Sequence, residues 1–155
     1  MHMKQLSMIL FVFLLVGLNA CKKDEDLNQS EQLVADIEKI EAYLKAHDLE
    51  AEKTTSGLYY IITNEGSGSH PTTNSNVTVQ YAGRLLEDGT EFDSGTQSFN
   101  LTGVISGWTE GIPKFKKGGR GQLFIPSYLG YGTSGSYSIP ANAVLIFDIH
   151  LINFN

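Results

Sequence analysis

The strongest sign of a functional site in this chain is a set of aromatic and apolar residues from separated stretches. The set comprises Tyr81, Phe92 with Asp93, Val104 and Ile105 leading to Trp108, and Phe147. Large aromatic side chains that converge from several strands form an apolar pocket. Asp93 would be the one strong polar group in that pocket. Such a site is suited to binding and desolvating an uncharged substrate, not to attacking it.

The composition argues against several other kinds of site. The net charge is -6 and the basic residues are scattered, whereas nucleic-acid binding requires a basic face. The four histidines do not cluster at metal-ligand spacing, and one Cys allows neither a disulfide framework nor a CxxC metal site. We therefore expect no metal, no cofactor and no nucleic-acid partner. A length of 155 residues allows one domain with short extensions.

Strands are the elements that must position these residues. Val77, Val79 and Tyr81 alternate with polar or small residues, which predicts a strand with one apolar face. An Asp88-Gly89 turn signal leads to Phe92 and Asp93. We expect strands at 58–62, 77–82, 98–101, 121–126 and 143–153, and a short helix at 107–115. This order predicts an α+β domain, an antiparallel sheet with one short helix. Pro113 should kink that helix or delay its start.

The first twenty residues resemble an export signal. Lys4 precedes an apolar run, Met8 to Leu18, that is too short for a transmembrane helix. The run ends in Leu18-Asn19-Ala20-Cys21, which resembles a bacterial lipobox. Cys21 would then be the lipidated N-terminus of the mature protein, and the lipid its only membrane contact. The alternative is an ordinary signal peptide followed by an incidental free Cys.

A charged segment and a helix connect this signal to the domain. Residues 21–29 are expected to form a solvated tether, either a plain spacer or a signal for export to the cell surface. Residues 30–50 are expected to hold an amphipathic helix, with Ser30 as its N-cap and 51–56 as the linker that follows. Its apolar stripe consists of Leu33, Ile37, Ile40 and Leu44. The stripe would dock on the domain or pair with a second copy of the helix in a homodimer.

Short runs between residues 57 and 155 match one family pattern in order. They are Val79–Gly83, Asp88–Ser94, Val104–Gly111, Gly118–Gly119, Ile125–Pro126, Tyr131–Gly132, Ile139–Pro140 and Leu145–Asp148. Each run alone is common, but all of them in sequence are specific. On these runs, residues 57–155 resemble an FKBP-type peptidyl-prolyl cis-trans isomerase domain. That family folds as a twisted antiparallel sheet wrapped around one short helix, in agreement with the α+β arrangement expected from the strands.

The resemblance implies rotation about the peptide bond before proline, which needs no nucleophile, metal or general base. It implies that Trp108 forms the pocket floor beneath the proline ring. The implied walls are Tyr81, Phe92, Phe99, Val104, Ile105, Ile139 and Phe147. For each aromatic residue, plain core packing is the alternative.

The resemblance also assigns the polar contacts. The backbone N–H of Ile105 and the hydroxyl of Tyr131 would bind substrate carbonyls. Asp93, held by Tyr81 or another donor, would orient the bound amide at the pocket edge. Tyr137 would contact the residue that precedes proline. For Asp93 and Tyr131 the alternatives are a turn-forming Asp and a loop aromatic.

These features predict an isomerase of the cell envelope, anchored by lipid to the outer membrane and facing the periplasm or the surface. Its partners would be proline-containing polypeptides, and macrolide ligands of the family would bind in the same pocket. Uncatalysed X-Pro isomerisation is slow enough to limit folding, so exported proteins would benefit. A chaperone module that binds proline-containing segments with weak turnover is the alternative. A surface lipoprotein that contacts other cells is a third.

Overall fold

The computed structural model describes the backbone of residues 20–155 and the side chains from residue 28. The expected signal peptide therefore lies outside the described residues, apart from the backbone of Ala20. The side chain of Cys21, the expected lipid attachment point, also lies outside them.

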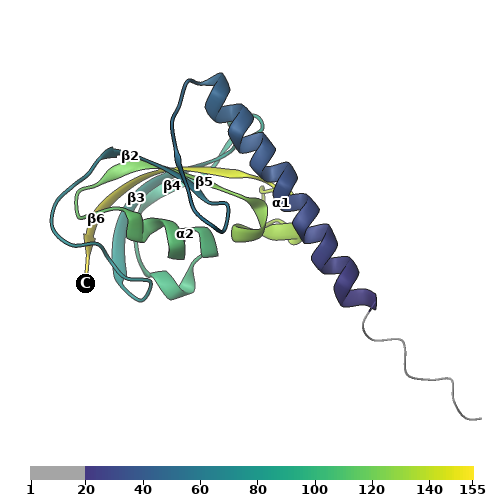
Figure 1. Ribbon diagram of the computed structural model, residues 1–155. Helices are drawn as coiled ribbons and strands as arrows, with labels where there is room; N and C mark the ends of the chain where they lie inside the picture. Colours follow the sequence, from purple (N-terminus) through teal and green to yellow (C-terminus); the bar gives the residue numbers. More distant parts are fainter. Residues whose placement is uncertain (1–19) are drawn as a thin grey trace, which may run out of the picture.

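The domain is built on a six-stranded sheet in which all neighbouring strands are antiparallel, in the order β1-β2-β5-β6-β3-β4. The strands are β1 (Glu52–Lys53), β2 (Tyr59–Asn64), β3 (Asn76–Leu85), β4 (Glu91–Asn100), β5 (Arg120–Ile125) and β6 (Leu145–Phe154). A short helix, α2 (Ser106–Gly111), lies under the sheet, as Figure 1 shows. This arrangement confirms the expected α+β fold.

The main core lies between the sheet and α2. Alternation along β3 and β6 sends one set of side chains to this face, because successive residues of a strand point to opposite sides. Val77, Val79, Leu145 and Leu151 are buried there with Trp108. The sheet therefore folds around α2 because its apolar faces can be buried there.

The hairpin of β3 and β4 is longer than expected. The expected short strand at 98–101 is the end of β4, which begins at Glu91 and pairs with β3 along its whole length. Most β4 side chains are exposed and polar. The strand therefore lacks the apolar alternation that marks a strand in sequence, and its ladder with β3 holds it instead.

Pro113 lies beyond the short helix and does not kink it. The α-helix ends at Gly111, and Pro113 lies in a 3-10 turn, η2 (Ile112–Lys114). The first N–H groups of a helical turn have no acceptor within that turn, so a proline there breaks no hydrogen bond. The expected helix at 107–115 is thus correct in place, but its second half is a tighter turn.

The first helix begins earlier than expected. It is α1 (Ala20–Ala46), so Ser30 lies inside it and is not its N-cap. Residues 21–29, expected as a tether, are helical. The physical reason is that residues 20–46 contain no Gly or Pro, so nothing interrupts the helix that the apolar stripe anchors. No helix in the described part of the chain is long and apolar enough to cross a membrane.

The apolar stripe of α1 docks on its own domain. Ile40 and Leu44 are buried against Tyr59, Phe124 and Ile146, which lie side by side on β2, β5 and β6. These three side chains belong to the face of the sheet opposite to α2, so the sheet has a second, smaller core. In Figure 1 the N-terminal turns of α1 extend past the domain. A second copy of the helix is not needed to cover the stripe.

The expected linker at 51–56 is also structured. Its first half contains β1, which pairs with β2 at the edge of the sheet. The β1 side chains are exposed, so no apolar pattern marks this strand in the sequence. Lys53 and Tyr59 both reach Glu41 of α1: Lys53 Nζ lies 3.3 Å and Tyr59 Oη 2.5 Å from Glu41 Oε1.

Candidate functional site

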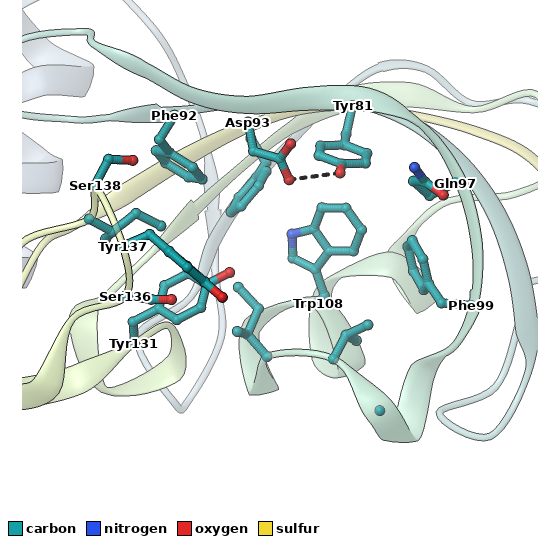
Figure 2. Close-up of a pocket in the computed structure, with 15 residues that line it drawn as sticks. Tyr81, Phe92, Asp93, Gln97, Phe99, Trp108, Tyr131, Ser136, Tyr137 and Ser138 are labelled. Atoms are coloured by element: carbon teal, nitrogen blue, oxygen red, sulfur yellow. Dashed lines mark hydrogen bonds between the residues drawn. The ribbon is translucent and has the colours of Figure 1, made fainter.

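A cavity of about 690 Å³ opens between the sheet and α2 (Figure 2). Residues of β3, β4, α2, β6 and the loop after β5 meet in it, although they are distant in sequence. Every residue that the sequence analysis placed at the site lines this cavity. They are Tyr81, Phe92, Asp93, Phe99, Val104, Ile105, Trp108, Tyr131, Tyr137, Ile139 and Phe147.

Trp108 forms the bottom of the cavity. It stands in the first turn of α2, after Ile105 as N-cap, and only 5% of its surface is exposed. Its ring meets those of Tyr81 and Phe147 edge-on, with centroids 5.0 Å apart in both pairs. Phe99 lies 5.2 Å away at a tilted angle. Edge-to-face packing of this kind holds aromatic rings rigidly, so the indole presents a fixed apolar surface.

A bulge in β4 directs two consecutive residues to the cavity. Gly83 pairs with Asp93 and Arg84 with Glu91, so Phe92 is an extra residue without a partner on β3. In a regular strand Phe92 and Asp93 would point to opposite faces. A bulge re-aims a side chain locally. As a result the Phe92 ring packs on Phe147, at 5.6 Å between centroids, while Asp93 also reaches the cavity.

Asp93 is held at the rim by a tyrosine. Tyr81 Oη donates a hydrogen bond to Asp93 Oδ2 at 2.8 Å, the dashed line in Figure 2. Burial, followed by this bond and the Asp93 charge, raises the pKa of Tyr81 to about 12. Burial also raises the pKa of Tyr131, and the charge of Asp93 adds to that effect. Both hydroxyls therefore keep their protons at neutral pH.

One wall of the cavity is a loop of residues 127–142, hereafter the wall loop. It contains two 3-10 turns, η3 (Ser127–Leu129) and η4 (Gly132–Ser134), and Tyr131 lies between them. Ile139 is buried, whereas Tyr137 is fully exposed with a positive φ of 48°. Tyr137 thus projects from the rim and does not fill the cavity.

A model of the FKBP-type peptidyl-prolyl cis-trans isomerase family matches residues 67–152. The chain belongs to this family. It is 45% identical over 126 residues to the probable FKBP-type isomerase FkpA of Neisseria meningitidis, covering 76% of this chain and 46% of that protein. The chain spans about half the length of the curated relatives it matches.

Solved structures of FKBP-type and related isomerases have the same fold. The crystal structure of FkpA from Escherichia coli has a TM-score of 0.70 and 35% identity, covering 86% of this chain and 66% of that one. A peptidyl-prolyl isomerase from Pseudomonas syringae has a TM-score of 0.68 and 30% identity, covering 81% and 95%. Both matches extend beyond the 67–152 core.

Some lining residues of this FKBP-type cavity were not expected from the sequence: Gln97, Gly103, Ser136 and Ser138. Gln97 could have been found, because it precedes Phe99 by two positions on the same face of a strand. Ser136 and Ser138 flank Tyr137 in a tight turn in which Ser136 and Ile139 exchange backbone hydrogen bonds. The family resemblance had placed Tyr137 and Ile139 of this turn at the site, but neither of the two serines.

The lining of this FKBP-type site offers mainly apolar surface, with a few polar donors and acceptors at its rim. The lining contains no Lys, His or Cys, and its one carboxylate is occupied by Tyr81. Among the side chains that the structure describes, from residue 28 onward, no group of His, Cys, Asp and Glu is arranged to hold a metal ion. The arrangement can desolvate an apolar group over Trp108 and offer hydroxyl and amide donors at its rim.

Proposed function

We propose that this chain catalyses cis-trans isomerisation of the peptide bond before proline in exported polypeptides. The observation that carries this proposal is the cavity itself. A rigid aromatic floor and walls surround a space large enough for a proline ring, with one tyrosine-bound carboxylate at the edge. Membership of the FKBP-type family supports the same reaction.

The proposed mechanism is preferential binding of the twisted amide. Rotation about the C–N bond has a barrier of about 18–20 kcal/mol, because the planar amide is stabilised by resonance. The twisted amide has lost that resonance and separates less charge between oxygen and nitrogen. An apolar cavity lined by Trp108, Phe99 and Phe147 disfavours the more polar planar amide, so it binds the transition state better. Only such differential binding accelerates the reaction.

The polar groups would hold the substrate and would not transfer protons. Tyr131 is a neutral donor at physiological pH, since a tyrosine hydroxyl ordinarily titrates near about 10 and burial raises its pKa further. Ile105 is the N-cap of α2, and the first N–H groups of a helix have no partner within the helix. These two donors would bind substrate carbonyls while Asp93 orients the amide. Tyr137, exposed at the rim, would contact the residue before proline.

Measuring the cis-to-trans rate of short X-Pro peptides with the full chain would test the proposal. We expect Trp108→Leu and Asp93→Asn each to lower kcat/KM by about tenfold or more, as expected for groups that bind the transition state. Glu87→Gln is the matched control, because Glu87 is an exposed carboxylate outside the cavity lining. Activity that survives both substitutions would show that the cavity is not the active site.

The same experiment separates the enzyme from the chaperone alternative. Trp108 is the single Trp of the chain, so its fluorescence reports ligand binding in the cavity. A full chain that binds proline peptides by this signal but does not accelerate their isomerisation would be a binding module. We also propose that macrolide ligands of the family bind here, and an unchanged fluorescence and heat signal on titration would contradict that.

We propose in addition that Cys21 carries a lipid that anchors the protein to the outer membrane. The support is the position of the chain's only Cys directly after an apolar run and Ala20. A Cys21→Ser variant expressed in a Gram-negative host should no longer partition with membranes or incorporate labelled fatty acid. Ser30→Ala serves as the control, since it changes a similar side chain without changing the attachment point. A Cys21→Ser protein that still fractionates with the outer membrane would exclude the lipid anchor.

A further inference from the structure

A buried carboxylate outside the cavity connects α1 to the wall loop. Asp36 has no exposed surface, although Asp is rarely buried without partners. Its Oδ2 accepts two hydrogen bonds from Ser127, one from the backbone N–H at 2.8 Å and one from Oγ at 2.6 Å. Its Oδ1 accepts a bond from Gln32 Nε2 at 2.8 Å. Both carboxylate oxygens therefore have hydrogen-bond donors, and the donor to Oδ2 lies 91 positions away in the sequence.

The residue that Asp36 holds is the first residue of the wall loop. Ser127 begins η3, and Pro126, its N-cap, provides no side-chain cap. Asp36 thus supplies the cap from another element. From Ser127 the loop continues through bonds of its own: Gly130 N–H to Ser127, Gly135 N–H to Tyr131 and Asn142 N–H to Gly132. A loop bonded internally in this way moves as a unit, so its attachment point sets the position of Tyr131.

A second contact fastens the same turn from the side. Tyr128 Oη donates to the backbone carbonyl of Ser56, in the segment between α1 and β2. Ser56 Oγ lies 2.7 Å and 2.9 Å from the two carboxylate oxygens of Glu110, on the helix that carries Trp108. The segment between β1 and β2 therefore contacts both the wall loop and α2. Only the Asp36 contact is fully buried.

We propose that Asp36 is a positioning residue for the isomerase: through Ser127 it fixes the wall loop against α1 and so sets where Tyr131 and Ile139 stand in the cavity. This inference rests on the proposed function. It makes α1 part of the catalytic unit and not merely a connection to the membrane. Because the loop would bind substrate carbonyls in both the ground state and the transition state, its misplacement raises KM more than it lowers kcat.

The test compares two carboxylates of α1 in the full chain. Asp36→Ala removes the acceptor of both Ser127 bonds, whereas Glu41→Gln weakens a bond between α1 and the sheet that does not involve the loop. We expect Asp36→Ala to raise KM about five- to tenfold, because it weakens binding of the ground state and the transition state alike. Glu41→Gln should change KM by less than about twofold. Asp36→Asn keeps one carbonyl acceptor, so its KM should lie between those of Asp36→Ala and the unaltered chain. It also carries the test if Asp36→Ala does not fold.

A double-mutant cycle with Tyr131→Phe shows whether Asp36 acts through the loop. Tyr131→Phe should raise KM by a clearly smaller factor in the Asp36→Ala background than in the unaltered chain, because the effects of two residues that act together are not additive. Independent, multiplicative effects would overturn the proposal. So would an Asp36→Ala protein with a lower melting temperature but unchanged KM, since that is the result of a purely structural role.

Amide hydrogen exchange provides a readout that does not depend on activity. The Leu129 and Gly130 N–H groups are bonded within η3. In Asp36→Ala they should exchange faster relative to amides of β3, and in Glu41→Gln they should not. Unchanged exchange in Asp36→Ala would refute the positioning role even if the chain proved inactive on X-Pro peptides. An inactive chain with selectively accelerated exchange would refute the proposed function and leave the contact between α1 and the loop established.

Discussion

Gly83 is a position where a single added methyl group should damage the aromatic walls of the cavity. It lies on β3 between the rings of Phe92 and Phe147. A Cβ added there would lie 2.6 Å from Phe147 Cε1 and 2.7 Å from Phe92 Cε2 and Cζ. Carbon atoms in contact prefer about 3.5–4.0 Å, so each ring would have to move by about 1 Å. The two rings already pack edge to face, so neither can yield without disturbing the other.

The energetic cost of Gly83→Ala follows from this overlap. Overpacking a core typically costs about 1–3 kcal/mol, while replacing Gly with Ala gains about 0.4–1 kcal/mol from the unfolded chain. We therefore expect Gly83→Ala to lower the free energy of unfolding by up to about 2.6 kcal/mol. The displaced rings line the cavity, so kcat/KM should also fall, by at least about fivefold.

Gly95 provides a matched control on the neighbouring strand. It pairs with Tyr81, and a Cβ added there meets no atom within 4 Å. Gly95→Ala should leave stability unchanged or raise it slightly. Urea unfolding followed by Trp108 fluorescence gives the free energies, and the peptide assay gives kcat/KM. If Gly83→Ala unfolds at the same urea concentration as Gly95→Ala and keeps full activity, the inferred rigidity of the aromatic walls is wrong.

Three further outcomes follow from the structure. Tyr81, with its pKa raised to about 12, holds its proton more tightly folded than unfolded, where the value is about 10. The stabilisation that protonated Tyr81 gives the folded state is therefore complete below about pH 10 and lost between about pH 10 and 12. In Tyr81→Phe, the urea midpoint should fall less steeply with pH over that range. Phe124 is buried in the core beneath α1, so Phe124→Ala should lower the free energy of unfolding in urea by about 3–5 kcal/mol. It should change KM for X-Pro peptides less than Asp36→Ala does. Arg84→Met, which breaks the partly exposed ion pair with Asp148, should cost no more than about 1 kcal/mol, and less in high salt.

Much of the fold could be predicted from apolar periodicity. β2, β3, β5 and β6 have sides that are buried, and burial leaves an alternating or continuous apolar pattern in the sequence. The exposed strand β1 and most of β4 leave no such pattern, because backbone pairing alone holds them. The start of α1 was missed for a related reason. A run of charged residues is compatible with either a helix or a solvated tether, and whether it is helical depends on the helix that follows it.

The site was predictable in its members but not in its geometry. The aromatic residues were identifiable because the family motifs place them in a fixed order. The bulge that brings Phe92 and Asp93 to the same cavity was not, because it arises from a register shift between β3 and β4. Ser136 and Ser138 were missed because a rim formed by a loop turn has no periodicity.

The sequence by itself determined an apolar pocket without a nucleophile, the family, and a helix with one apolar stripe. Only the tertiary structure decided what the stripe covers and what Asp36 does on the same helix. A periodic pattern reports that a face is apolar, since it reflects the chain's local geometry. It does not report which distant surface will bury that face, or that Ser127 will meet a carboxylate 91 residues earlier. Such contacts depend on how all the strands stack together, and here they connect α1 to the wall of the cavity.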